Sequence, residues 1–289
     1  MTTHQLIPSA AVHTLLADFS LEMTGKDVDH LVAARESIPH GTRVHVTYLE
    51  HEDLEQRMAA VTAARECGFV PVAHVSARRL TSHEQLEELL SALVAEGAAD
   101  SIFVVAGDPH TPHGPYADAM AVIDSGLLES YRVRHVSVAG YPEGHPDISA
   151  PILWTALEDK FSTLSQRALT GDVVTQFGFD AELVLDWIEQ VRSRGVTMPI
   201  RVGVPGPAGI KRLVRYAARF GVGTSAGIAK KYGFSITNLL GTAGPERFIH
   251  ALAQGYSAER HGEVKLHFYT FGGLGATSKW IEDYKGSLR

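Results

Sequence analysis

The sequence predicts an α/β protein of the (β/α)8 TIM-barrel class, in which eight parallel strands close into a barrel inside a ring of helices. Short apolar runs alternate eight times with amphipathic helical patterns, which is typical of parallel strands covered by helices. The length of 289 residues is slightly above the roughly 250 residues typical of such a barrel. No Gly-x-Gly-x-x-Gly turn follows the first strand, which disfavours an open dinucleotide-binding sheet. We therefore expect one barrel domain over residues 1–289.

The first half of the chain predicts five strand-and-helix units after a polar lead-in. Val28, Leu31 and Val32 have helical spacing, Gly68 ends the second helix, and Thr81-x-x-Glu84 is a capping-box pattern. Four leucines at 86, 89, 90 and 93 then share one helix face. Strands are expected at 17–22, 43–49, 69–75, 101–106 and 135–139, and helices at 25–37, 52–67, from 81, 116–127 and 154–169.

The second half continues the alternation with three further strands. The same apolar and amphipathic patterns, with Gly195 after a helix, set the boundaries. Strands are expected at 172–176, 199–204 and 264–270, and helices at 181–194, 209–220, 245–254 and 278–284.

Composition and charge reduce the number of possible partners and ligands. A net charge of -7 without a long basic block argues against nucleic acid as the main partner and favours a small-molecule substrate. No apolar run approaches the roughly 20 residues of a membrane span, and no basic leader opens the chain, so a cytoplasmic location with no membrane association is expected. Cys67 is the single cysteine, and the 15 histidines are scattered without a His-Glu-x-x-His pattern, so no metal site is expected.

Candidate site residues follow the strands, because the active site of this barrel lies at their carboxyl ends. Six strands end in hydrogen-bonding side chains, which together predict a polar pocket. They are Glu22, Thr47 with Tyr48, His74, Asp108, Tyr141 with His145, and Gln176. A carboxylic acid that emerges from an apolar strand is partly desolvated, which favours its neutral form and suits a proton donor. A glutamine offers a donor and an acceptor to a heterocycle edge.

Several ordered segments resemble the methylenetetrahydrofolate reductases over nearly the whole chain. These are Tyr-Pro-Glu-Gly-His-Pro at 141–146, Ala-Gly-Asp-Pro at 106–109, Thr-Gln-Phe-Gly-Phe-Asp at 175–180, Leu-His-Phe-Tyr-Thr at 266–270 and Ser-Leu-Glu-Met at 20–23. The resemblance implies a barrel that binds FAD and passes hydride from NADH or NADPH to 5,10-methylenetetrahydrofolate. The product is 5-methyltetrahydrofolate, and the reverse direction is equally compatible. Barrels of this family commonly associate, so a homo-oligomer is expected.

The resemblance also assigns residue roles. Glu22 is implied as the general acid that protonates N10 of the folate, and Asp108 as the negative charge that stabilises the resulting cation. The implied folate contacts are Glu22, Asp108, Gln176, Phe179 and Ile210. The implied flavin contacts are Thr47, Tyr48, His74, Gly107, Asp108, Ala117, Tyr141 and His145, with Lys160 at the pyrophosphate.

Some family positions differ in this chain. Ala106 and Ala156 replace basic residues near the flavin phosphates, Ile210 replaces a phenylalanine that packs on the folate or nicotinamide, and Gly272 and Gly273 replace an arginine. Two alternatives to the flavin-dependent reductase therefore stay open. One is direct hydride transfer from NADH without flavin, and the other is a folate-binding barrel without catalysis.

Overall fold

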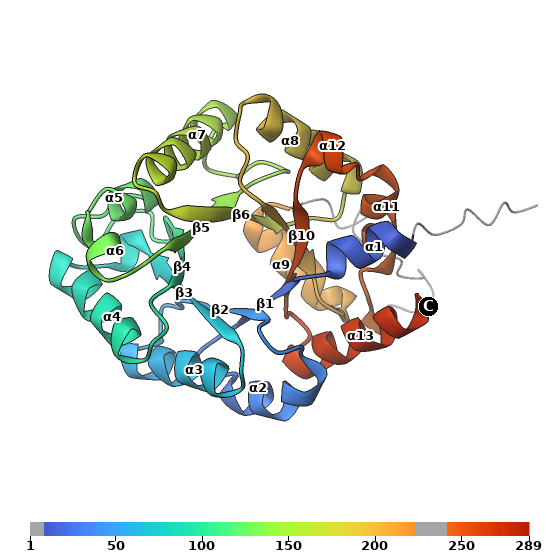
Figure 1. Ribbon diagram of the computed structural model, residues 1–289, viewed down its shortest axis with the longest axis horizontal. Helices are drawn as coiled ribbons and strands as arrows, with labels where there is room; N and C mark the ends of the chain where they lie inside the picture. The colour runs from blue at the N-terminus through green and yellow to red at the C-terminus, as the bar shows by residue number, and fades with distance from the viewer. Residues whose placement is uncertain (1–8, 223–241, 289) are drawn as a thin grey trace, which may run out of the picture.

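A computed structural model describes residues 9–222 and 242–288 of the chain. Within these residues eight parallel strands close into a barrel ringed by helices (Figure 1), in the order β1-β10-β7-β6-β5-β4-β3-β2. The predicted (β/α)8 class is confirmed. The barrel strands are β1 (Ser20–Met23), β2 (Arg43–Val46), β3 (Val70–Ser76), β4 (Ser101–Val105), β5 (His135–Gly140), β6 (Thr170–Phe177), β7 (Ile200–Pro205) and β10 (Val264–Tyr269).

The outer helices pack their apolar faces on the barrel, and the four leucines predicted to share a face of α4 are buried. No helix among the described residues has the length and apolar character needed to cross a bilayer. The outer helices are α2 (Val28–Ala34), α3 (Leu54–Glu66), α4 (His83–Ala95), α5 (Ala119–Ile123), α6 (Leu127–Ser130), α7 (Ala150–Gln166), α8 (Ala181–Ser193), α11 (Glu246–Gly255), α12 (Ala258–His261) and α13 (Leu274–Ser287), with 3-10 turns η1 (Arg35–Ser37) and η2 (Ala77–Arg79).

Several local predictions were wrong. The last helix, expected at 278–284, runs over Leu274–Ser287. The helix expected at 116–127 is two short helices, because Gly126 adopts a left-handed φ of 73° between them. The helix expected at 154–169 begins earlier, at Ala150, because Pro151 fits the first helical turn. The cap of α4 lies one residue later than expected, with Ser82 accepting from the Gln85 amide.

The segment expected to be a polar lead-in contains a helix, α1 (Ser9–Leu16). Its side chains Val12, Leu15 and Leu16 are completely buried. It lies beside α11 and the start of β10 (Figure 1). The pattern is one short apolar stripe, which is too brief to predict a helix by periodicity alone.

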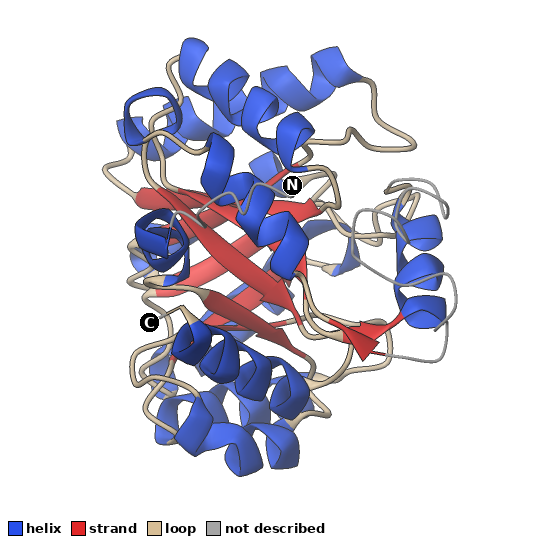
Figure 2. Cartoon of the chain, turned by 90° about the vertical axis from the view of Figure 1, so that its right-hand side faces the viewer, coloured by secondary structure: helices blue, strands red, loops and turns tan. Residues whose placement is uncertain are grey.

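A small extension stands at the carboxyl ends of the strands. A two-stranded antiparallel pair, β8 (Ala208–Gly209) and β9 (Thr242–Ala243), accompanies α9 (Ile210–Phe220). Figure 2 shows this helix standing apart from the outer ring at the end toward which the strand arrows point. The outer position between β7 and β10 is filled by α11, which packs on α8.

The barrel interior contains both apolar and polar side chains. Val72, Phe103 and Val174 form a small apolar cluster. Buried polar side chains, which include Ser20, His45, His74 and His267, lie next to it, and the Phe103 ring is 4.7 Å from that of His74 and 5.6 Å from that of His45. The apolar character predicted for the strands therefore comes mainly from residues that face the helices, as Leu21, Val44 and Phe268 do.

Candidate functional site

The structure brings the predicted strand-end residues to one rim, because all eight strands are parallel and the barrel is closed. Glu22 is on β1, His74 on β3 and Gln176 on β6, while Thr47, Asp108 and Tyr141 directly follow or closely follow their strands. The carboxyl-terminal rim is therefore the place where their side chains can act on one ligand.

Glu22 lies next to the buried polar side chains of the barrel interior. Its side chain is 19% exposed, and Oε2 lies 3.7 Å from Nε2 of the buried His267. The Thr270 hydroxyl donates to the Glu22 carbonyl at 2.7 Å, which fixes the β1 backbone against the end of β10. Glu22 is thus held in place while its carboxyl group keeps access to the rim.

Three histidines that are far apart in the sequence meet beneath Glu22. The His45 ring centroid lies 4.6 Å from that of His267 and 5.5 Å from that of His74. Burial and the neighbouring imidazoles hold the pKa of His45 well below its ordinary value and lower the pKa of His74 to about 3. Among the described residues no group of three His, Cys, Asp or Glu is placed to hold a metal ion.

Many buried polar atoms around these histidines have no hydrogen-bond partner within the described residues. Buried polar groups are normally paired with protein or water, so this region can accept a polar ligand or water. The unpaired atoms here are both ring nitrogens of His45, Nε2 of His74 and His267, Oγ1 of Thr47, Oγ of Ser76 and Nε of Arg57.

The buried Arg57 supports this side of the rim. Its Nη2 donates to the His74 carbonyl at 2.7 Å, and its guanidinium lies 3.8 Å from the centre of the Tyr48 ring. Burial lowers the pKa of Arg57 to about 10, so the side chain is still a cation at neutral pH. Tyr48 is therefore held by a cation–π contact.

Tyr269 links Glu22 to the loop after β5. Burial raises the pKa of Tyr269 well above its ordinary value, and the charges of Glu22 and Tyr141 raise it further. Its hydroxyl donates to the Thr175 carbonyl at 3.0 Å. Glu22 and Tyr141 thus both lie within electrostatic reach of one tyrosine, although more than a hundred residues separate them in sequence.

The 141–146 loop is fixed by local contacts. Gly144 adopts a φ of 83° and donates to the Tyr141 carbonyl at 3.0 Å. The rings of Tyr141 and His145 meet edge to face at 5.2 Å, and burial lowers the pKa of His145. Glu143 accepts from the Phe179 amide at 3.1 Å, which joins this loop to the loop after β6.

A β-bulge sets the direction of the Gln176 side chain. The register against β7 shifts between Val174 and Phe177, and bulges of this kind redirect a side chain. Gly203 on β7 allows the bulge because it has no side chain, whereas a Cβ at this position would collide with the Thr175 carbonyl oxygen. The Oε1 atom of Gln176 accepts from the amide of Phe177 at 3.1 Å.

The segment after β4 holds Asp108 in an ion pair. The Asp108 side chain is 58% exposed, and Nη2 of the largely buried Arg79 lies 2.7 Å from its Oδ1. Gly107 has a φ of 92° and leaves room for the Ser76 hydroxyl. The exposed Ala117 offers its carbonyl to Arg78 Nε at 2.7 Å. Sequence reasoning missed Arg79, because nothing in its own pattern marks it.

Aromatic side chains gather between α9 and the rim. Ile210 is 7% exposed and packs in a cluster with Phe177 and Phe179. The rings of Tyr216 and Phe271 stack at 4.2 Å, and Phe271 meets Phe177 at 5.0 Å. This cluster supplies aromatic faces close to the position at which the family's phenylalanine is replaced by Ile210.

A cavity of about 370 Å³ opens between α5 and α7. Its lining residues are Asp118, Met120, Pro151, Ile152, Thr155, Ala156 and Asp159, so its charged groups are both acids. Burial lowers the pKa of the adjacent Lys160, while Asp118 and Asp159 oppose that shift. The two carboxylates thus outnumber the one lysine.

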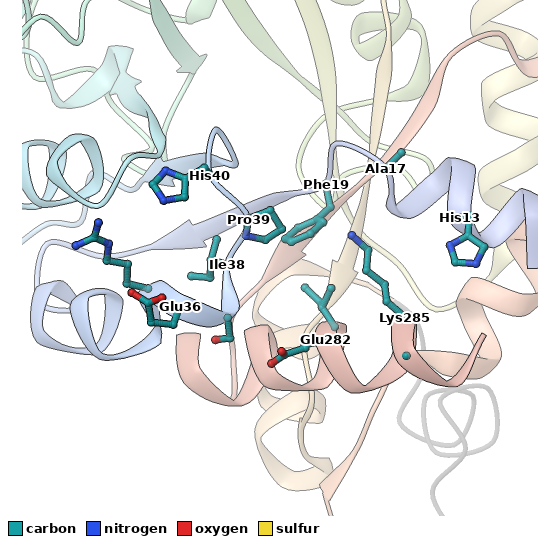
Figure 3. A pocket seen from close by; sticks show the side chains of 13 residues that line it. His13, Ala17, Phe19, Glu36, Ile38, Pro39, His40, Glu282 and Lys285 are labelled. Atoms are coloured by element: carbon teal, nitrogen blue, oxygen red, sulfur yellow. The ribbon is translucent and has the colours of Figure 1, made fainter. Parts of the chain in front are cut away.

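A cavity of about 830 Å³ lies at the opposite end of the barrel, between α1, η1 and α13 (Figure 3). Lys285 extends across it toward Phe19, with Nζ 5.0 Å from the ring centre, while Glu36 and Glu282 lie on its wall. None of the predicted site residues lines this cavity. The predicted site residues lie instead at the carboxyl-terminal ends of the strands.

Comparison with known proteins identifies the family of this chain. The family model described as methylenetetrahydrofolate reductase matches residues 14–278. Methylenetetrahydrofolate reductase (NADH) 1 of Zea mays is 26% identical over 137 residues, 42% of this chain and 22% of that protein. The Arabidopsis thaliana protein of the same name is 27% identical over 150 residues, 46% of this chain and 24% of that protein. The aligned regions thus span under a quarter of these relatives. Dihydropteroate synthase from Thermus thermophilus superposes with a TM-score of 0.48 at 15% identity, covering 93% of each chain.

Proposed function

Because the chain belongs to the methylenetetrahydrofolate reductase family, we propose that it reduces 5,10-methylenetetrahydrofolate to 5-methyltetrahydrofolate, or runs the reverse reaction. The observation that carries this proposal is Glu22, a partly exposed carboxyl group next to the buried His267 at the strand ends. The curated relatives bear NADH in their names, which favours NADH over NADPH as the hydride donor.

Glu22 gives its proton to N10 of the folate, and the bond between N10 and the bridging carbon breaks. The resulting N5 iminium cation accepts hydride at that carbon and becomes the methyl group. One proton and one hydride are consumed, and the nicotinamide leaves oxidised. Gln176 and Tyr141 line the same rim and orient the pterin, while the paired Asp108 contributes a weaker negative charge than a free carboxylate.

FAD is the cofactor that the family resemblance implies, and few free cations surround the position implied for its diphosphate. Ala106 and Ala156 supply no cation, and the charge of Lys160 is opposed by Asp118 and Asp159. The two nearby arginines already have partners, because Arg78 donates to the Ala117 and Pro109 carbonyls and Arg79 is paired with Asp108. A diphosphate there would add negative charge beside two carboxylates, which like-charge repulsion disfavours. We therefore favour direct hydride transfer from the nicotinamide to the folate, with a flavin-mediated reaction as the alternative.

The proposal is tested by incubating the purified chain with NADH and methylenetetrahydrofolate and measuring 5-methyltetrahydrofolate by chromatography. We expect product from a protein without flavin absorbance. A yellow protein that NADH bleaches would support the flavin-mediated alternative. Absence of product both with and without added FAD would leave a folate-binding barrel without catalysis.

Glu22→Gln is the decisive variant. Loss of a general acid lowers turnover by about 10²- to 10⁴-fold, so the folate step should fall by that factor while NADH binding is retained. The matched control is Glu36→Gln, which removes a carboxylate at the opposite end of the barrel and should leave turnover unchanged. Equal activity of the Glu22 variant and the wild type would contradict the assigned role.

A further inference from the structure

The cavity at the amino-terminal end of the barrel, between α1, η1 and α13, is large enough for a small organic ligand. Its volume of about 830 Å³ falls within the range of about 300–1,000 Å³ that is typical of ligand pockets. Phe19, Ile38 and Ile281 form an apolar wall of this cavity. All three belong to the main hydrophobic core, so the wall is fixed before any ligand binds, which lowers the entropic cost of binding.

Lys285 places an ammonium group against this apolar wall. Its Nζ lies 5.0 Å from the centre of the Phe19 ring, and Figure 3 shows the side chain crossing the cavity. Burial lowers the pKa of Lys285. The neighbouring acid Asp283 is paired with Lys279 at 3.2 Å. Lys285 is thus a half-buried cation with an aromatic contact but no anionic partner among the residues that the structure describes.

Two carboxylates line the same cavity. Glu36 on η1 and Glu282 on α13 both lie on its wall, and neither forms an ion pair within residues 9–222 and 242–288. Glu282 precedes Lys285 by about one turn of α13, a spacing at which opposite charges often pair, yet Lys285 points toward Phe19. Because Arg35 is also on the wall, a simple anion or cation would face a like charge there. A zwitterion meets a complementary charge at each end.

We propose that this cavity binds a free α-amino acid with a large apolar side chain. The carboxylate of the amino acid accepts from the Lys285 ammonium group, and its own ammonium group donates to Glu282. The apolar side chain packs on the wall beside Phe19. This site lies at the end of the barrel opposite to Glu22, so the inference goes beyond the proposed folate reduction and does not depend on it.

Titration of the purified full chain with L-phenylalanine, followed by protein NMR, tests the inference. Two analogues are matched probes, because 3-phenylpropionate lacks the ammonium group and 2-phenylethylamine lacks the carboxylate. L-Phenylalanine should bind with a dissociation constant of about 1 mM or lower. The amine should bind at least about tenfold more weakly, and the acid at least about threefold more weakly. Absence of L-phenylalanine binding at about 10 mM, or equal binding of either analogue, would overturn the inference.

Two variants test the contacts within the cavity. Lys285→Met should weaken the binding of L-phenylalanine and of 3-phenylpropionate about tenfold, since both ligands carry the carboxylate. Glu282→Gln should weaken L-phenylalanine about threefold and should not weaken 3-phenylpropionate, which has no ammonium group. Lys279→Met is the matched control, because Lys279 lies on the same helix, is paired with Asp283 and does not line the cavity. It should leave all three affinities unchanged.

An unchanged affinity for L-phenylalanine in either cavity variant would overturn the inference, because the amino acid would then bind elsewhere. Thermal unfolding checks that each variant is folded. If Lys285→Met does not fold, the exposed Glu282→Gln decides the outcome through its opposite effects on the two carboxylate ligands. Binding needs no turnover, so a chain that makes no 5-methyltetrahydrofolate would contradict the proposed function alone, and a chain that binds no amino acid would contradict this inference alone.

Discussion

At the amino-terminal end of the barrel, buried charges are paired with one another. Arg201 is 3% exposed and Asp172 is 2% exposed, and Nε of the arginine lies 2.6 Å from Oδ2 of the aspartate. Nη2 of Arg201 also lies 2.8 Å from Asp18 Oδ2, which Arg43 contacts at 2.7 Å. Burial raises the pKa of Asp172, but His135 and Arg201 outweigh that effect and lower it below its ordinary value.

At the carboxyl-terminal end, the buried polar side chains lack such partners. His45, His74 and His267 have ring nitrogens without hydrogen bonds among the described residues, and Thr47 and Ser76 have unpaired hydroxyl oxygens. Unpaired buried polar groups cost stability. At the amino-terminal end Oδ1 of Asp172 and Nε2 of His135 also have no hydrogen bond, but these two atoms lie 3.5 Å apart. The comparison teaches that buried charges at one end of the barrel compensate one another, while the other end retains unsatisfied imidazole and hydroxyl groups that a ligand can use.

The largest expected effect comes from breaking the paired end. Removal of one partner of a buried ion pair costs about 3–5 kcal/mol, so Arg201→Met should lower the free energy of unfolding by that amount in urea titrations at pH 7. Turnover per folded molecule should be unchanged, because the pair lies away from the rim. A loss no larger than about 1 kcal/mol would show that the pairing is not stabilising.

The matched control for this variant is the exposed pair between Arg134 and Asp100, whose side chains are 81% and 52% exposed. Surface pairs contribute about 0–1 kcal/mol, so Arg134→Met should have a small effect. The pairing of Asp172 should also be lost in acid. Its folded pKa lies below its unfolded value of about 4, so its contribution is present above that pH and disappears as the pH falls toward the folded pKa.

The pH dependence of the free energy of unfolding should also distinguish the two ends, with a smaller effect. His74 has a folded pKa of about 3 and an unfolded value of about 6.5, so the unfolded chain binds an extra proton between these values. Stability should therefore fall as the pH drops below about 6.5. Replacement by phenylalanine removes this linkage. When the pH is lowered from 7.5 to 5, the free energy of unfolding of His74→Phe should therefore decrease by roughly 2 kcal/mol less than that of the wild type.

The control for the pH measurement is His30→Phe, since the His30 side chain is 72% exposed. Its unfolding free energy should follow the same pH dependence as the wild type. Parallel curves for His74→Phe and the wild type would instead mean that the paired end alone sets the acid sensitivity of the fold.

The smallest expected effect concerns the aromatic cluster. An aromatic contact contributes about 0.5–1.5 kcal/mol, so Phe271→Ala should raise the KM for NADH or the folate by about threefold to tenfold in steady-state kinetics. Val32→Ala, at a 55% exposed position on α2, is the control and should leave both constants alone. Unchanged KM values for both substrates would show that Phe271 serves only packing of α9.

Much of the architecture follows from local patterns. The leucines of α4 predict its buried face, and the apolar strands predict the parallel barrel. The ordered segments around Glu22, Tyr141 and Gln176 predict which strand ends form the rim. The sequence reading missed α1, whose stripe is short, and it did not give the orientation of Gln176, which depends on a bulge that Gly203 on another strand permits.

The sequence by itself determined the order of strands and helices and the chemistry available at each strand end, because both depend on neighbouring residues. Only the tertiary structure decided which inward-facing side chains meet. Strands buried on both faces lose the simple alternation that marks one side as interior, so the grouping of His45, His74 and His267 depends on strand register. The pairing of Arg201 with Asp172, the contact between His267 and Glu22, and the placement of α9 over the rim depend on that same closure of the barrel.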